Sequence, residues 1–294
     1  MPAAVSILPA QQLAALNDSY RRAVAKKRLR MTLVTAVGFA ALLMAAMGAE
    51  VNLTTFFGKI GNFASYFDRI FTLESGARAW SDIGEWFWGW SKWLSLLGET
   101  VLISYVGTLV GALLAFGLNF LAAENTAPSA PLRFVVKRFM EFCRTVPDIV
   151  FALIFVIAFG LGPIAGVLAI AIHCIGALGK QYSEIVENID MKPVEGIRST
   201  GAGWTDCMRF AVLPQVAAGF AGYTLLRFEI NVRGAGVMGF VGAGGIGQEF
   251  LVAIRNFYYT DVSAILLMII ATVITIDLVT ERIRHRLIGF GEHS

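Results

Sequence analysis

The stretch VSAILLMIIATVITIDLVT, residues 262–280, contains a single charged side chain, Asp277. As a helix this stretch would rise about 28 Å, close to the roughly 30 Å hydrocarbon core of a bilayer. A run this long and this apolar is typical of a transmembrane helix. The whole chain agrees, because 56% of its 294 residues are hydrophobic, 15% are charged and the mean hydropathy is +0.67.

Outward from this run, other stretches are also long and apolar enough to cross a membrane. They are residues 31–49, 96–122, 139–160, 163–180 and 211–231. We therefore predict an all-α membrane protein with six transmembrane helices. The first run follows a basic stretch, as in a signal peptide, but about twenty residues precede that stretch and no clear cleavage site follows. We expect this run to be a retained helix.

Lysine and arginine accumulate before the first run, between the second and third, and after the last. With six spans these clusters lie on one side of the membrane, which the positive-inside rule makes the cytoplasm. Both termini are therefore predicted to be cytoplasmic. The charges are divided among loops that flank the membrane, so the net charge of +3 predicts a lipid neighbour and no nucleic-acid partner.

The spans divide the chain into three parts. Residues 1–30 are expected to be a cytoplasmic segment, residues 31–95 the first helix with an external segment, and residues 96–294 the main membrane domain. The external segment contains WSDIGEWFWGWSKW, whose tryptophans favour an interfacial anchor over an aromatic ligand cage. The three cysteines have no paired spacing, so neither a disulfide framework nor a metal site is expected.

The stretch VGAGGIGQEF, residues 241–250, has the spacing G-x-G-x-x-G at Gly242, Gly244 and Gly247, with Asp261 further on. This is the fingerprint of a dinucleotide-binding turn, which needs a strand before it and a helix after it. Here the segment lies between two predicted membrane helices. We therefore expect no nucleotide cofactor at this stretch, and a membrane oxidoreductase is the less favoured alternative.

The cytoplasmic loop, residues 181–210, and the start of the next span contain EGIRSTGAGWTDCMRFAVLP, residues 195–214. This stretch resembles the EAA loop of ABC-importer permeases at Glu195, Gly201, Leu213 and Pro214. Gly196 and Ile197 replace the two alanines of that pattern, and Ala211 stands at its isoleucine.

The resemblance implies a coupling helix that docks onto an ATPase subunit. Val194, Ile197 and Trp204 would supply apolar contact, Glu195 an ion pair, and Gly201 a helix end. An ordinary amphipathic loop helix is the alternative interpretation. The chain has no P-loop, since GIRSTGAG lacks the lysine that binds the phosphates, so we expect a transport subunit that is not an enzyme and a separate partner that hydrolyses ATP.

The chain from about residue 96 onward is also similar to phosphonate permeases of the ABC-transporter superfamily (PhnE type). The segments that carry this likeness are RTVPDIVFALIF (144–155), ENIDMKPVEGIRSTGA (187–202), Asn231-Val232-Arg233, Val241 to Gly247, Phe257-Tyr258-Tyr259, Asp277 and the basic tail. Methionine-type permeases share a similar glycine-rich stretch.

This resemblance implies a type I importer of the bacterial cytoplasmic membrane, with the MetI-like fold. It would contain two permease copies, two ATPase subunits that bind ATP and Mg, and an external phosphonate-binding protein. Import would proceed by alternating access. A permease for methionine or another small solute is the runner-up, and a structural membrane scaffold is a further alternative.

Several charged residues fall within predicted spans, where a charge costs about 2.5–3.5 kcal/mol on insertion scales. They are Glu141, Arg144 and Asp148 on the third helix, and Arg227, Glu229 and Arg233 on the fifth. Their spacing predicts the pairs Glu141–Arg144 and Glu229–Arg233. Alternatively, Arg144, Arg227 or Arg233 lines a route for an anion.

The glycine-rich stretch falls on the outer side in this topology. Its glycines, Gly242, Gly244, Gly245 and Gly247, are predicted to form an extracytoplasmic gate or re-entrant loop near the mouth of the pathway. A plain tight connection between two helices is the alternative.

Overall fold

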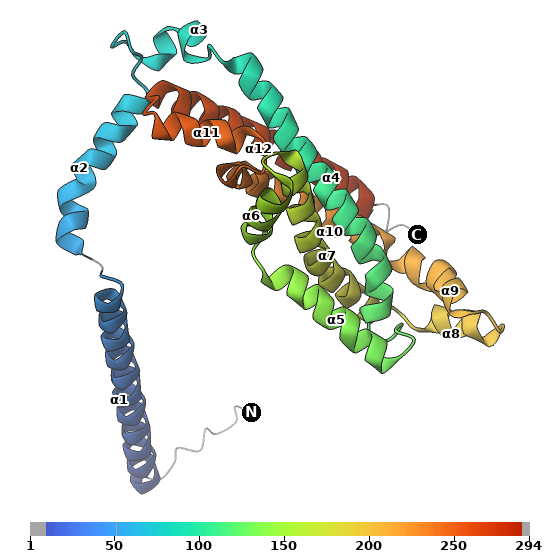
Figure 1. Ribbon diagram of the computed structural model, residues 1–294. Coiled ribbons are helices and arrows are strands. Elements are labelled where there is room, and N and C mark those ends of the chain that lie inside the picture. The colour runs from blue at the N-terminus through green and yellow to red at the C-terminus, as the bar shows by residue number, and fades with distance from the viewer. Residues whose placement is uncertain (1–9, 51, 290–294) are drawn as a thin grey trace, which may run out of the picture. The chain divides into compact units, whose positions relative to one another are not determined.

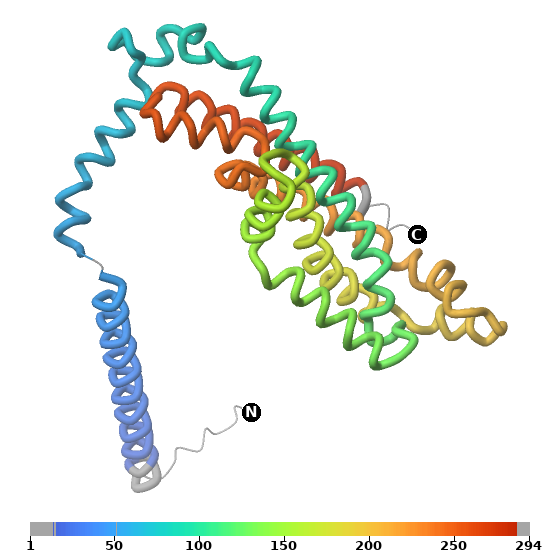
Figure 2. Tube along the Cα trace, in the orientation of Figure 1, coloured from blue at the N-terminus to red at the C-terminus, as the bar shows by residue number. Residues whose placement is uncertain are grey.

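The computed structural model describes residues 10–50 and 52–289, and within these it is helical apart from turns and one isolated β bridge between Thr72 and Arg78. The expected all-α class is confirmed. Figures 1 and 2 follow the chain through its helices. The contacts divide the chain into two compact units, the first ending at Ser65 and the second beginning at Tyr66.

The first unit consists of α1 (Ala10–Gly48) and most of α2 (Leu53–Ile70). In α1 the basic residues and the apolar run belong to one uninterrupted helix, of which Leu16–Gly48 is long and apolar enough to span a bilayer. Helix α2 is amphipathic, because Phe56, Phe57 and Ile60 recur at helical spacing among polar residues.

The second unit contains the remaining helices. These are η1 (Ala79–Ser81), α3 (Ile83–Trp86), α4 (Trp90–Ala122), α5 (Ala130–Thr145), α6 (Asp148–Phe159), α7 (Pro163–Glu187), α8 (Lys192–Ser199), α9 (Trp204–Cys207), η2 (Met208–Val212, a π turn), α10 (Leu213–Met238), η3 (Gly239–Val241), α11 (Ile246–Arg255) and α12 (Tyr259–Gly289).

Across the described residues, four single helices are long and apolar enough to span a membrane, and two bent pairs bring the number to as many as six. The third predicted span, residues 139–160, is not one helix as expected. It lies across α5 and α6, which meet at 85°. Pro147 has no N–H and disfavours helical dihedrals in the preceding residue, and Val146 is indeed extended (φ −76°, ψ 125°).

The centre of the second unit is the packing of α4, α7 and α10, which lie side by side in Figure 1. Gly107 and Gly111, four residues apart on α4, bring its backbone against α7. A Cβ on Gly107 would stand 2.7 Å from Cβ of Ile170, and one on Gly111 would stand 2.7 Å from the carbonyl oxygen of Ala171. Small residues at this spacing allow membrane helices to approach closely.

The tryptophan-rich segment divides between the surface and the core. Trp80, Trp88 and Trp90 are exposed, as an interfacial anchor requires, but Trp86 and Trp93 are buried. Nε1 of Trp86 donates to Oγ of Ser263 on α12 at 2.9 Å, and Nε1 of Trp88 donates to Asp261 at 2.9 Å. Part of the expected anchor therefore attaches α3 to the start of α12.

Candidate functional site

The loop between α7 and α10 carries the residues that resemble a coupling helix. Helix α7 continues to Glu187, so the loop proper is shorter than the predicted range of 181–210. It holds α8 and α9, which extend beyond the ends of α7 and α10 in Figure 1.

The base of this loop is fixed by polar contacts. The backbone N–H of Asp190 donates to the Gln215 side chain at 3.1 Å, and that side chain donates back to the Asp190 carbonyl at 3.2 Å. Nε1 of Trp204 donates to the carbonyl of Thr126, beyond the end of α4, at 2.7 Å. The loop is thereby joined to α10 and to the segment that follows α4.

Within α8, the side chains divide between an inner and an outer face. Val194 is 1% exposed and packs in the core with Val212, and Ile197 is partly buried beside it. Val194 therefore attaches α8 to its own chain and is not available for the apolar contact with a partner that we expected of it. Glu195 is exposed, and Gly201 takes the expected left-handed conformation (φ +84°) after the helix end.

Leu213 and Pro214 occupy the first turn of α10, but the helix does not start there as predicted. It continues back through the π turn η2 and α9 to Trp204. An internal proline clashes with the carbonyl four residues earlier, and a wider turn at that point relieves the clash. Pro214 thus fixes the rotation of α9 relative to α10.

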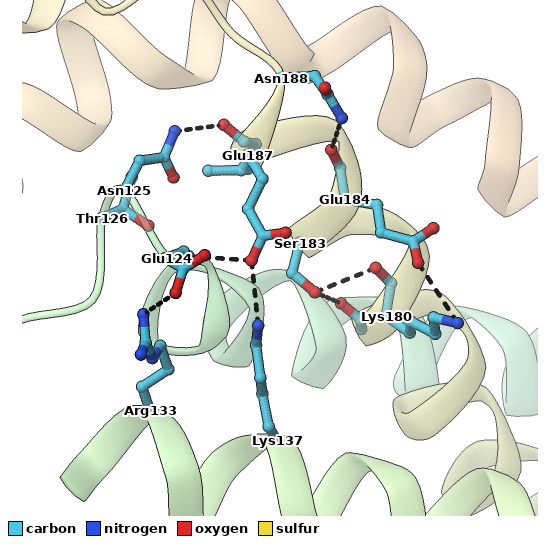
Figure 3. A network of polar contacts seen from close by, with 12 residues as sticks. Glu124, Asn125, Thr126, Arg133, Lys137, Lys180, Ser183, Glu184, Glu187 and Asn188 are labelled. Carbon is cyan, nitrogen blue, oxygen red and sulfur yellow. Dashed lines mark hydrogen bonds and ion pairs between the residues drawn. The ribbon is translucent and has the colours of Figure 1, made fainter. Parts of the chain in front are cut away.

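Ion pairs join the loop ends of α4, α5 and α7 on the same side, as Figure 3 shows. Arg133 pairs with Glu124 at 2.7 Å, and Lys137 pairs with Glu187 at 3.1 Å. Oε1 of Glu187 also accepts from the backbone N–H of Glu124 at 3.0 Å. These contacts hold the ends of α4, α5 and α7 together next to the start of the loop.

The charged residues within the spans do not form the pairs that their spacing predicted. Glu141 pairs with Arg138 at 2.6 Å and not with Arg144. Arg233 pairs with Asp277 of α12, whose two oxygens lie 2.9 and 2.8 Å from Nη2. Both Glu229–Arg233 and Glu141–Arg144 are thus wrong as pairs.

The physical reason at Arg233 is that α12 lies antiparallel beside α10 and offers partners that a same-helix pattern does not reveal. Glu229 is 7% exposed and accepts a hydrogen bond from the Thr280 hydroxyl of α12. Asp277 and Thr280 are three residues apart on α12 and therefore lie close together on its surface. Asp277 contacts Arg233 of α10, and Thr280 contacts Glu229 of α10. These contacts join two spans.

Arg227 has a different partner, His173 on α7, which the sequence did not single out. Nη2 of Arg227 hydrogen-bonds to Nδ1 of His173, while Nε of Arg227 is buried without a hydrogen-bond partner. A lone histidine in an apolar run carries no spacing signal. Only the packing of α7 on α10 brings the two together.

Arg144 and Asp148 lie on either side of the break between α5 and α6. In the described chain neither takes part in an ion pair. Arg144 lines a cavity of about 220 Å³ between α5 and α7, whose other charged residues are Lys137, Glu141, Lys180, Glu184 and Glu187. The predicted arginines of the route therefore fall into two kinds: Arg233 forms an ion pair with a carboxylate, whereas Arg144 and Arg227 form none in the described chain.

The glycine-rich stretch forms a compact turn between η3 and α11. Gly242, Gly244 and Gly245 all have positive φ, and Gly247 packs against the backbone of α10. The backbone N–H of Gly245 donates to Glu99 at 3.1 Å, and that of Ile246 to Thr100 at 2.9 Å, both on α4. No strand precedes this turn in the part of the chain that the structure describes, so the context of a dinucleotide fingerprint is missing.

Residues 107–288 match the family model described as the inner membrane component of binding-protein-dependent transport systems. Because this match covers more than half of the chain, the protein belongs to that family. It is accordingly a membrane-embedded transport subunit, as the apolar helices indicate.

Transport permeases of bacteria are similar in sequence to much of this chain. The chain is 42% identical over 192 residues to the phosphite transport system permease protein PtxC of Stutzerimonas stutzeri, covering 65% of this chain and 70% of that protein. It is 40% identical over 190 residues to the phosphate-import permease protein PhnE of Mycolicibacterium smegmatis, covering 65% of this chain and 36% of that protein.

A shorter relative is the putative cryptic phosphonate transport system permease protein PhnE2 of Escherichia coli K12. It is 47% identical over 121 residues, which are 41% of this chain and 99% of that protein.

Solved structures show the same fold. The MetNI methionine ABC transporter in an inward-facing conformation matches with a TM-score of 0.57 at 19% identity, covering 66% of this chain and 95% of that chain. An amino acid ABC transporter solved with histidines matches with a TM-score of 0.54 at 18% identity, covering 68% of this chain and 98% of that chain. At these identities the likeness establishes the MetI-like permease fold and carries nothing about cargo.

Proposed function

We propose that this chain is the permease subunit of an ATP-driven importer for phosphonate or a related phosphorus oxyanion such as phosphite or phosphate. The observation that carries the cargo is the 40–47% identity to permeases named for phosphite, phosphate and phosphonate transport. Arg144 and Arg227, which form no ion pair within the described residues, support an anion, because a guanidinium offers forked donors to phosphate-like oxygens.

The assembly proposed is two copies of this chain, two ATPase subunits and an external binding protein that delivers the cargo. ATP and Mg would be held by the ATPase. Glu195, exposed on α8, would pair with a basic group of that subunit, while Val194 and Trp204 attach α8 to the membrane helices. Closure of the ATPase dimer on ATP would then pull α8 and open the pathway outward, and hydrolysis would reverse it.

The glycine-rich turn keeps its proposed place at the outer mouth of the pathway. Gly242, Gly244, Gly245 and Gly247 lie at the outer ends of α4 and α10 in the predicted topology, and their tight packing supports a seal there. A role in opening stays a prediction.

Cargo is tested by reconstituting the permease with its ATPase and binding protein in liposomes and measuring ATP-dependent uptake. We expect uptake of at least one of methylphosphonate, phosphite and phosphate, and none of methionine. Uptake of methionine without any phosphorus oxyanion would overturn the proposed cargo and favour the runner-up.

Coupling is tested by Glu195→Ala in the same liposomes. Loss of a charge-assisted contact at an interface commonly costs 2 kcal/mol or more, so uptake should fall by about tenfold or more while the permease remains folded. Glu184→Ala is the matched control, since Glu184 is an exposed carboxylate at the cytoplasmic end of α7 outside α8. Full uptake by Glu195→Ala would contradict the coupling assignment.

A further inference from the structure

The break between α5 and α6 places charged groups beside α7 and α10, away from the ends of these long helices. Arg144 is in the last turn of α5, and Gly176 in the middle of α7 packs against its backbone. Asp148 is the first residue of α6. A charge at this depth is costly unless it faces a partner or a wet cavity.

Arg227 approaches the break from α10. Arginine can only donate hydrogen bonds, so Nδ1 of His173 accepts from Nη2 and the imidazole is neutral in this arrangement. The contact therefore orients the guanidinium without neutralising its charge. The buried Nε–H has no acceptor, and an unsatisfied buried donor is unfavourable until an acceptor arrives.

Asp148 lies at the start of α6, which packs against α7 as α10 does. Within the described residues Asp148 and Arg227 form no ion pair with each other. Oδ1 of Asp148 accepts from the backbone N–H of Ile149 at 2.9 Å. Oδ2 faces α10 at Gly234, 3.5 Å from where a Cβ would stand.

Two other polar side chains of α10, Asn231 and Arg233, already have hydrogen-bond or ion-pair partners. Nδ2 of Asn231 donates to Thr108 at 2.7 Å and to Sγ of Cys174 at 3.0 Å, which joins α4, α7 and α10 behind the site. Arg233 is neutralised by Asp277. Arg227 is thus the guanidinium on α10 that retains both its charge and a free donor within the described residues.

We propose that Arg227 of α10 and Asp148 of α6, two helices that both pack against α7, form a counter-ion exchange site for one tetrahedral oxyanion. In the empty transporter the Asp148 carboxylate balances Arg227. A passing oxyanion takes over this role, accepting from Arg227, and the repulsion from Asp148 prevents tight binding and promotes release toward Arg144. The inference rests on the proposed cargo and adds the residues that hold and expel it.

Opposite effects of two charge-removing variants distinguish this site from a structural cluster. Asp148→Asn leaves Arg227 uncompensated, so the transporter should bind methylphosphonate more tightly by about tenfold and release it more slowly, with a lower maximal uptake rate. Arg227→Gln should weaken binding by about tenfold or more. A gain of affinity cannot result from misfolding, which keeps the first variant informative even if the second is unstable.

The measurement is equilibrium binding of methylphosphonate to the permease–ATPase complex in lipid nanodiscs without the binding protein, followed by uptake in liposomes. Asp68→Asn is the matched control, because it also removes an aspartate carboxylate and leaves an arginine, Arg78, unpaired outside the site. It should leave the affinity unchanged.

Two results would overturn the proposal. One is that Asp148→Asn and Arg227→Gln shift the affinity in the same direction or not at all, while the unmodified complex transports a phosphorus oxyanion. The other is that the unmodified complex neither binds nor transports any of phosphonate, phosphite and phosphate, in which case the cargo fails first and this site with it.

Discussion

At the scale of single residues, Gly245 shows how closely the outer turn is fitted to α4. Its φ of +77° lies in the left-handed region, and a Cβ there would collide with the Thr100 hydroxyl. The same hydroxyl accepts from the backbone N–H of Ile246. Any side chain at Gly245 therefore both strains the backbone and displaces a hydrogen-bond acceptor.

We expect Gly245→Ala to lower the free energy of unfolding by about 1–3 kcal/mol, the usual cost of a side chain forced into this region. Thermal unfolding of the purified protein in detergent measures the effect. Gly117→Ala on α4 is the control, because no atom lies within 4 Å of its Cβ position and alanine favours helix. Equal unfolding temperatures for the two variants would refute the strain at Gly245.

The intramembrane charges show what residue spacing does and does not reveal. The sequence correctly indicated that Arg144, Asp148, Arg227, Glu229 and Arg233 need an explanation, because lipid does not solvate them. It assigned partners along one helix, whereas the structure places those of Arg227, Glu229 and Arg233 on other helices, at His173, Thr280 and Asp277. Those contacts depend on helix packing.

At the scale of elements, two prolines produce two different interruptions. Pro147 separates α5 from α6 with an 85° bend, whereas Pro214 lies in a helix that continues through a π turn. Both residues lack an N–H and clash with the preceding turn. The outcome differs because Val146 becomes extended, while the residues before Pro214 stay helical in a wider turn.

Pro214→Ala tests whether the π turn sets the orientation of the coupling loop. Restoring the N–H allows an ordinary α turn, which would rotate α9 and α8 by about 100° relative to α10. We expect stability to be unchanged or higher and uptake to fall by about tenfold, measured by thermal unfolding and liposome uptake. Normal uptake would mean that the π turn has no role in coupling.

At the scale of the whole molecule, the second unit has hydrophobic clusters of its own. One lies among α4, α7 and α10, and another joins α3, α11 and α12. The family match, residues 107–288, falls within this unit. The family match therefore includes no residue of α1.

A protease site introduced between Gly48 and Leu53 and cleaved after purification tests whether the stability of the second unit depends on α1. We expect the unfolding temperature of the second unit to be unchanged, because its clusters contain no residue of α1. The uncleaved protein with the same insertion is the control. A clear drop in unfolding temperature on cleavage would show that α1 contributes to the stability of the core.

The sequence by itself determined that the chain is an all-helical membrane protein, and it located the loop that resembles a coupling loop. The length of each apolar run and the distribution of lysine and arginine among the loops follow directly from the order of the residues. The motif from Glu195 to Pro214 likewise lies within one short stretch of sequence. Tertiary structure alone decided that Val194 faces inward, that Arg233 pairs with Asp277, and that His173 holds Arg227. These facts depend on which faces of α7, α10 and α12 meet, and that is set by close packing between segments far apart in the sequence.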